Sequence, residues 1–159
     1  MAEQEEHMNS DAIVDKIGNS EGGYSMETFG LKVHIPIKSG EIKAAIKNLD
    51  PIPNTGLNDQ VLLVIENVRG NEDALMLKVS VDQKNAGNFS LYGIGNASGP
   101  AGEGLSFTLD ITDIILDIDS EETKDWGTLD VDISPHRNPK GIKDITIGNI
   151  SVYLVRQQR

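Results

Sequence analysis

Short runs of alternating apolar and polar residues, separated by turn-forming residues, recur along this chain. Such a period of two is typical of β-strands with one buried and one solvated face. In "TLDVDIS", for example, Leu129, Val131 and Ile133 fall on one face while Asp130 and Asp132 fall on the other. The pattern predicts seven strands, at Leu31–Ile37, Val61–Val68, Leu75–Asp82, Asn88–Tyr92, Leu105–Ile111, Thr128–Ser134 and Ile145–Leu154.

Two segments instead have the spacing of short helices. In Ser39–Asp50 the apolar residues recur at three- and four-residue intervals, and Asp110–Ile118 contains a second pattern of this kind that begins at Thr112 or Asp113. Seven strands at this spacing predict an all-β protein, an antiparallel sandwich or barrel with one or two short helices. Pro36 cannot donate to a sheet ladder, so its strand is expected to lie at an edge or to end there.

The chain of 159 residues has the length of one ordinary domain. Residues 1–23 are rich in polar residues and glycine and are expected to form a flexible N-terminal tail, with a single sandwich domain over residues 24–159. The pair His7 and Met8 is typical of a cloning remnant, so residues 1–8 carry no functional expectation.

Composition narrows the possible functions. The chain has no cysteine, which excludes disulfides, thiolate metal sites and a cysteine nucleophile. Its net charge of −11 disfavours nucleic acid and anionic membranes as partners, because the 14 basic residues are scattered among 25 acidic ones. No apolar run approaches the length of a membrane-spanning helix, which is about 20 residues. The chain is therefore expected to be soluble, and its compartment stays open.

Candidate catalytic and metal-binding groups are sparse. The three histidines, His7, His34 and His136, have no ligand spacing, and no nucleophile, P-loop or dinucleotide motif occurs. The sequence therefore predicts no enzyme and no cofactor. The acidic stretch "DIDSEE" offers a cation site or, more simply, a solvated turn; it lacks the spacing of an EF-hand, and its candidate ligands are Asp117, Asp119 and Glu121.

Four blocks of sequence, taken in order, carry a resemblance to a known family: "VLLVIENVRGNEDALMLKVSVD", "NFSLYGIG", "EGLSFTLDITDII" and "WGTLDVDISPHRNPKGIKDITIGNISVYLV". They resemble the C-terminal domain of the tyrosinase and polyphenol oxidase family over residues 30–155. Lys78 and Val81 keep the first and last positions of that family's Lys-Phe-Asp-Val motif, whereas the middle pair differs. Ser134–Arg137 and Ile145–Ile150, which includes Gly148, match a later pair of family strands.

The resemblance implies a β-sandwich of the jelly-roll type that covers the active site of a separate catalytic domain. In that family, six histidines on a helical bundle hold two copper ions, and neither the bundle nor the histidines occur in this sequence. The implied partner is such a dicopper domain, in the same polypeptide or in another one. The implied function is to keep the enzyme latent, and assistance with folding or copper loading is a further role that the resemblance suggests.

A covering domain of this kind places a side chain in the entrance of the copper site. Tyr92 is the first candidate, because it follows a strand and precedes the glycine-rich loop Gly93–Gly104, which is expected to be mobile. Phe29 and Leu31 are the next candidates. Trp126 and Phe107 are interpreted as core residues. The alternative function is a carbohydrate-binding or other ligand-binding sandwich module, although the aromatic content of 4% is low for a sugar-stacking platform.

Overall fold

The computed structural model describes residues 12–26, 30–49, 59–70, 76–100, 102–136 and 145–157. Eight strands in these ranges form two four-stranded sheets in which every strand pair is antiparallel. The first sheet has the order β1-β8-β3-β6 and the second has the order β2-β7-β4-β5. The first sheet contains β1 (Ala12–Ser25), β3 (Gln60–Arg69), β6 (Leu105–Asp110) and β8 (Thr146–Gln157). The second contains β2 (Leu31–Pro36), β4 (Met76–Val81), β5 (Lys84–Ser90) and β7 (Thr128–Pro135).

The strand pairing is nested: β1 pairs with β8, β2 with β7, β3 with β6 and β4 with β5. This is the arrangement of a jelly roll, in which one long antiparallel ribbon folds over into two sheets. The predicted all-β sandwich is therefore confirmed. Pro36 ends β2, which lies at an edge of its sheet, as the sequence predicts.

The core lies between the two sheets because inward-facing residues of both are apolar and almost completely buried. On β3 these are Val61, Leu63 and Ile65, and on β7 they are Leu129, Val131 and Ile133. Alternation along β7 leaves Asp130 and Asp132 on the outer side, as predicted. Phe107 stacks on Phe89 with ring centroids 3.9 Å apart and packs against the core.

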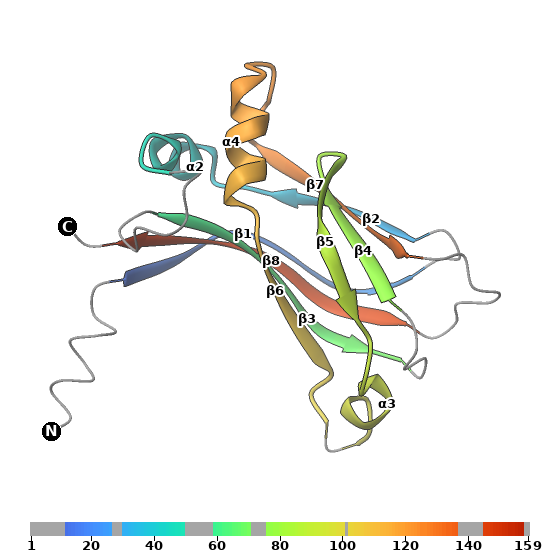
Figure 1. Cartoon of the computed structure of the whole chain (residues 1–159). Coiled ribbons are helices and arrows are strands. Elements are labelled where there is room, and N and C mark those ends of the chain that lie inside the picture. Colours follow the sequence, from blue (N-terminus) through green and yellow to red (C-terminus); the bar gives the residue numbers. More distant parts are fainter. Residues whose placement is uncertain are drawn as a thin grey trace, which may run out of the picture.

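Two of the three described helices are those that the sequence predicts. α2 (Ser39–Ile46) buries Ile42 and Ala45, and α4 (Thr112–Ser120) buries Ile115 and Ile118. Figure 1 shows α2 and α4 at one end of the sandwich and α3 (Ile94–Ala97) at the other. None of the helices in the described residues is long and apolar enough to cross a membrane.

Two expectations about secondary structure are wrong. Residues 12–23, assigned to the flexible tail, form most of β1, which pairs with β8 along its length, and the rest of the predicted tail, residues 1–11, lies outside the described residues. Its apolar pattern is interrupted by irregularities between Lys16 and Gly18 and between Glu21 and Tyr24, so strict alternation does not reveal it. The strand predicted at Asn88–Tyr92 runs instead from Lys84 to Ser90, which leaves Tyr92 outside the sheet.

Candidate functional site

Tyr92 projects from a turn at the α3 end of the sandwich, and its side chain is 83% exposed. The turn is anchored on both sides, because Leu91 and Ile94 are fully buried. The Tyr92 backbone N–H donates to Ser90 Oγ (3.1 Å) and the Ile94 N–H donates to the Leu91 carbonyl (2.9 Å). Gly93 adopts φ +85°, a left-handed conformation that glycine accepts without steric cost. The result is a fixed backbone that presents an exposed aromatic ring.

The described residues of the loop that follows are fastened to the end of β3. Arg69 donates from Nη2 to the Gly102 carbonyl (2.7 Å) and from Nη1 to the Ser98 carbonyl (3.4 Å). The Gly70 N–H donates to Ser98 Oγ (2.9 Å), and the Gly104 N–H donates to the Ala97 carbonyl (2.9 Å). The sequence predicts a mobile loop here; the described residues are instead held by side-chain and backbone hydrogen bonds.

Strand register places Leu31, another candidate for the projecting side chain, at the same end of the molecule as Tyr92. Met76 pairs with Ser90, and Leu31 pairs with Ile133, two residues before the end of β7. Leu31 is partly buried and packs against the core, whereas Met76 is exposed. The α3 end therefore carries two exposed large apolar side chains, Tyr92 and Met76. Phe29, the remaining candidate, lies outside the described residues.

The three positions that match motifs of the resembled family are Lys78, Val81 and Gly148, and each can be placed in the fold. Val81 is fully buried, while Lys78, on the same strand, is exposed. A Cβ atom at Gly148 would lie 2.6 Å from Asn67 Nδ2, so a larger residue there would displace that side chain. Asn67 occupies the irregularity between Ile65 and Val68, where β3 departs from regular pairing with β6. Glycine at position 148 thus permits the close approach of the two strands.

The three acidic residues that the sequence offers as cation ligands lie in two different places in the structure. Lys84 Nζ binds Asp117 Oδ2 (2.8 Å) and Glu121 Oε1 (3.1 Å), which links α4 to the start of β5. Hydrogen bonds that Lys84 donates to Asp117 and then to Glu121 raise the pKa of Lys84 above its usual value, because both carboxylates stabilise the ammonium form. Asp119 instead lines a pocket beside α2. Within the described ranges, no group of three histidine, cysteine, aspartate or glutamate side chains is placed to hold a metal ion.

A copper centre does not fit the histidines that the structure describes. His34 lies on β2 opposite Asp130 and hydrogen-bonds to its carboxylate, whereas His136 follows the other end of β7. His7 lies outside the described residues. The side chains that would share a metal are therefore separated by the length of a strand.

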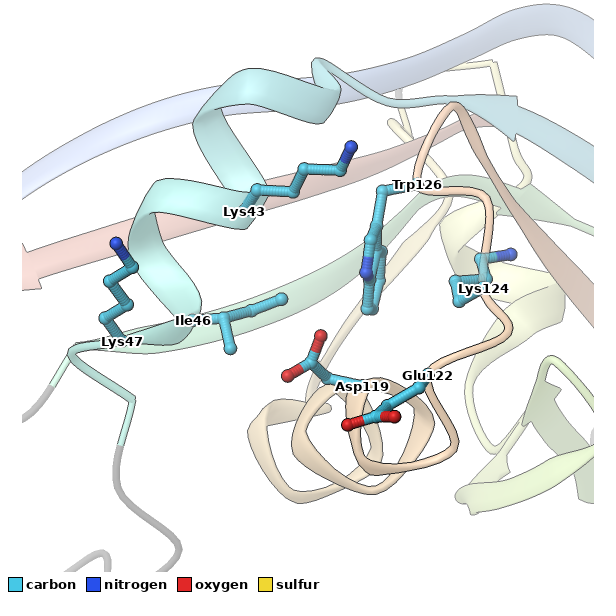
Figure 2. Close-up of a pocket in the computed structure, with 7 residues that line it drawn as sticks. All are labelled: Lys43, Ile46, Lys47, Asp119, Glu122, Lys124 and Trp126. Atoms are coloured by element: carbon cyan, nitrogen blue, oxygen red, sulfur yellow. The ribbon is translucent and has the colours of Figure 1, made fainter.

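A pocket of about 410 Å³ lies between α2 and α4, at the end opposite Tyr92. Figure 2 shows Lys43 and Lys47 on the α2 side, Asp119 and Glu122 on the α4 side, and the Trp126 ring between them. Trp126 is only 4% exposed and closes this end of the core, as the sequence predicts. The lining of this pocket carries three lysine side chains and two acidic ones. Sequence reasoning did not identify it, because its two walls come from segments more than 70 residues apart.

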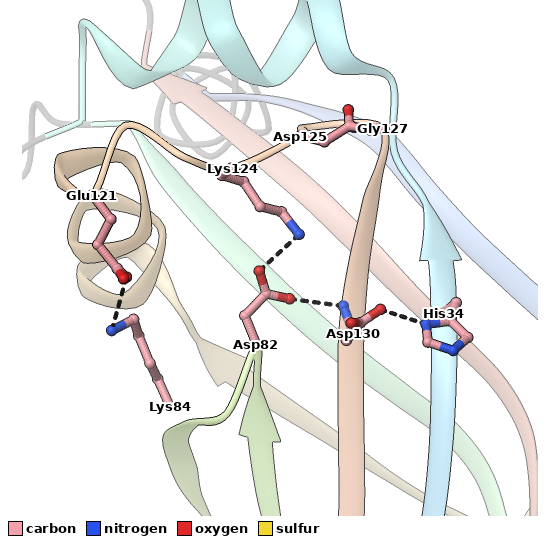
Figure 3. A network of polar contacts seen from close by, with 8 residues as sticks. All are labelled: His34, Asp82, Lys84, Glu121, Lys124, Asp125, Gly127 and Asp130. Carbon is pink, nitrogen blue, oxygen red and sulfur yellow. Dashed lines mark hydrogen bonds and ion pairs between the residues drawn. The ribbon is translucent and has the colours of Figure 1, made fainter.

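Beside this pocket, a polar network ties the loop before β7 to the sheet (Figure 3). Lys124 Nζ binds Asp82 Oδ2 (2.7 Å), and Asp82 Oδ1 accepts a hydrogen bond from the Asp130 N–H (2.9 Å). The side chains of Lys124 and Asp82 are only 14% and 15% exposed. The network is consistent with a structural role in holding β4, β7 and the connecting loop together.

The fold is similar to part of three solved polyphenol oxidase structures. Latent aurone synthase (polyphenol oxidase) from natural source matches with a TM-score of 0.55 and 13% identity, covering 95% of this chain and 30% of that chain. The recombinantly expressed latent enzyme gives 0.55 and 14%, covering 95% and 29%. Its form co-crystallised with hexatungstotellurate(VI) and soaked in H2O2 gives 0.51 and 15%, covering 86% and 26%. The chain thus spans about a quarter to a third of the length of these proteins.

At such low identity, these similarities establish a shared fold. No curated protein sequence matches the chain. A family model does match, and it covers residues 13–155, which include every strand of both sheets at least in part. The chain therefore belongs to the family described as domain of unknown function DUF7868.

Proposed function

We propose that this chain is a non-catalytic domain that covers the dicopper active site of a polyphenol oxidase-like enzyme and keeps that enzyme latent. The partner is a dicopper catalytic domain, in the same polypeptide or in a separate one. The observation that carries the proposal is the exposed Tyr92 ring on its anchored turn at the α3 end. The similarity of fold to part of the latent aurone synthases supports it.

A cover of this kind needs a rigid scaffold and one projecting side chain. Here the scaffold is the jelly roll, and hydrogen bonds from Arg69 fix the loop next to the projecting residue. A fixed backbone lowers the entropy lost when Tyr92 enters a site. The phenol ring of Tyr92 also has the functional group of a phenolic substrate, so it would occupy a phenol-binding opening in competition with substrate.

The test is a titration of this chain into a polyphenol oxidase-type catalytic domain freed from its own cover, with initial rates of diphenol oxidation as the readout. We expect inhibition at micromolar chain concentrations. Tyr92→Ala should relieve the inhibition with a smaller effect on binding, since most of the contact area lies elsewhere. His34→Ala is the matched control, because His34 is a similarly exposed ring on the outer side of the second sheet.

Two outcomes would change the proposal. An absence of inhibition well above micromolar concentrations would exclude the covering role. Inhibition that Tyr92→Ala leaves intact would retain the role and move the projecting side chain to Met76, Leu31 or Phe29.

The alternative, a carbohydrate-binding module, predicts several exposed aromatic rings on one surface. Among the described aromatic residues, Tyr92 alone is exposed, whereas Phe89 and Trp126 are buried and the others are partly buried. Saturable binding of an oligosaccharide that Tyr92→Ala abolishes, without inhibition of the oxidase, would favour this alternative.

A further inference from the structure

The two sheets of this sandwich have different outer faces. On the second sheet, the outward side chains of β2 and β7 are charged: Lys32 lies opposite Asp132, and His34 lies opposite Asp130. Such a face is fully compatible with water. The outer face of the second sheet therefore shows what a water-exposed sheet surface looks like in this chain, and the first sheet can be compared with it.

The outer face of the first sheet carries a group of apolar side chains in the middle of its two central strands, with polar side chains beside it. Leu63 and Ile65 of β3 point into the core, so Leu62 and Val64, which alternate with them, point outward. On β8 the outward positions opposite them are Tyr153 and Ser151, and the Ser151 hydroxyl donates to Asn19 Oδ1 (2.8 Å) and accepts from Asn149 Nδ2 (3.0 Å). The unbroken apolar run of β3, Val61–Ile65, is typical of a strand that is covered on both faces. In the described part of the chain the helices lie at the two ends of the sandwich and leave this face uncovered (Figure 1).

One row across this face is charged at its two ends with opposite signs. Strand register aligns Lys16 with Tyr153, Tyr153 with Leu62, and Leu62 with Asp110. Lys16 Nζ lies 5.7 Å from the centroid of the Tyr153 ring, which places both side chains on the same face. Lys16 is on the edge strand β1 and Asp110 on the opposite edge strand β6, and both residues are exposed. The row therefore reads cation, aromatic, aliphatic, anion.

This row is complementary to itself. A two-fold axis parallel to the strands, between β8 and β3, would place β1 of one copy over β6 of the other and β8 over β3. Lys16 of each copy would then face Asp110 of the other, and Tyr153 would face Leu62. In aligned packing, the strands of the two sheets cross at about 30°. At the edge of the sheet, this rotation shifts Lys16 of one copy by only about 4 Å relative to Asp110 of the other, which is within reach of a lysine side chain. In the next row, Asn19 would face Thr108 and Ser151 would face Val64.

We infer that the outer face of the first sheet is an interface for a second copy of this chain. Its area agrees with this: four strands about 4.8 Å apart, over the 10 residues of β3, bury roughly 600 Å² per copy, or roughly 1,200 Å² in total. That is the low end of specific interfaces, where weak and transient complexes are found, so the association is expected to be reversible and to depend on concentration. Because the axis runs parallel to the strands, both Tyr92 ends point the same way and stay clear of the interface.

The test is sedimentation velocity of the full chain from about 1 to 300 μM at about 0.15 M salt, where the Debye length of about 8 Å screens the net charge of −11. We expect a monomer–dimer equilibrium. Lys16→Glu replaces two attractive pairs with two repulsive ones and should raise the dissociation constant about tenfold or more. Lys32→Glu is the matched control: it is the same change on an edge strand of the second sheet, and it should leave the equilibrium unchanged.

Charge exchange gives the sharper result. Asp110→Lys alone should also weaken the dimer, and an equimolar mixture of Lys16→Glu and Asp110→Lys chains should form heterodimers, in which both pairs are attractive again. Asp110 also accepts hydrogen bonds from Thr112 at the start of α4, so the fold of that variant is checked by its melting temperature. If it does not fold, Lys16→Glu against Lys32→Glu decides alone. A chain that is monomeric at 300 μM, or a dimer that Lys16→Glu leaves unaffected, would overturn the inference.

Discussion

The pair formed by Asp82 and Lys124 offers a sharp test of how this sandwich is held together. Asp82→Ala removes a carboxylate that has two partners: Lys124 Nζ at 2.7 Å and the Asp130 N–H at 2.9 Å. Lys124 is only 14% exposed, so its ammonium group would stay largely desolvated without a counter-charge. The Asp130 N–H, at the end of the β4–β7 pairing, would lose its acceptor as well.

The magnitude follows from these two losses. Removing one partner of a fully buried ion pair costs about 3–5 kcal/mol, and leaving a buried backbone donor unsatisfied costs about 1–3 kcal/mol. Both groups here keep some access to water and can relax toward it. We therefore expect Asp82→Ala to lower the free energy of unfolding by about 2–4 kcal/mol. For a domain of this size, that corresponds to a fall in melting temperature of roughly 5–15 °C.

Companion variants separate the charge from the hydrogen bond. Asp82→Asn keeps an acceptor for the Asp130 N–H and should cost less than Asp82→Ala. Lys124→Met leaves the Asp82 carboxylate without its counter-charge, but Asp82 keeps the hydrogen bond from the Asp130 N–H and the methionine keeps the packing of the aliphatic stem, so this variant should also cost less than Asp82→Ala. The control is Asp132→Ala, because the Lys32–Asp132 pair spans 3.8 Å with side chains 67% and 31% exposed. That exposed pair should contribute less than about 1 kcal/mol.

Urea denaturation followed by circular dichroism measures these differences, and equal m-values across the variants would keep the comparison two-state. If Asp82→Ala and Asp132→Ala lower the free energy of unfolding equally, burial does not explain the contribution of the Asp82–Lys124 pair to stability. If Asp82→Ala cost less than about 0.5 kcal/mol, the network in Figure 3 would not hold the loop to the sheet.

Four further predictions concern other parts of the molecule. Leu63→Ala should cost about 2–5 kcal/mol because Leu63 is fully buried, whereas Leu62→Ala, on the outer face next to it, should cost clearly less in urea melts; equal losses would contradict the register of β3. The raised pKa of Lys84 makes its stabilising contribution complete below about pH 10.5 and lost as the pH rises through the folded value, so the difference in melting temperature between the native chain and Lys84→Ala should shrink only in strongly alkaline solution; a difference that already shrinks as the pH rises from about 7 to about 9 would contradict this. Arg69→Ala should speed hydrogen exchange in residues 98–104 without a comparable change in the core strands, and uniform protection would show that Arg69 does not fasten the loop. The purified chain should lose added copper on dialysis and should not oxidise a diphenol, and stoichiometric retained copper with quinone formation would contradict the assignment of the copper site to a partner.

Strand positions in this protein could be predicted where burial alternates strictly, and less well where neighbours provide the stabilisation. β7 is visible in "TLDVDIS" because each apolar residue faces the core. β1 is not, since its two irregularities interrupt the alternation and its partner β8 provides much of the apolar surface. The start of β5 is similarly hidden in "KNAGN", an edge segment with few apolar residues. The four residues of α3 are too few to show a helical period.

In the candidate site, too, some features follow from neighbouring residues in the sequence and others depend on contacts between residues far apart in it. Tyr92 could be chosen from its sequence neighbours alone, because an aromatic residue between a strand and a glycine is easily left outside a core. The contacts that fix its surroundings could not, since Arg69 reaches Gly102 across 33 positions of sequence. The Asp82–Lys124 pair likewise joins a turn and a loop that lie 42 residues apart in the sequence. Charges in polar turns are usually solvated, so nothing in their local sequence marks these two as buried.

The rigidity of the turn that carries Tyr92 also affects how well the chain would act as the proposed cover. Tyr92 has few contacts for its own ring, yet the residues on either side are buried and hydrogen-bonded. A flexible loop carrying the same tyrosine would lose more conformational entropy on entering a partner and would bind more weakly for the same contacts. Arg69→Ala therefore gives a mechanistic test that Tyr92→Ala cannot give: it leaves the ring in place and loosens only its support. If the ring acts as a preorganised plug, Arg69→Ala should weaken inhibition of the oxidase; if inhibition is unchanged, the plug needs no prior order.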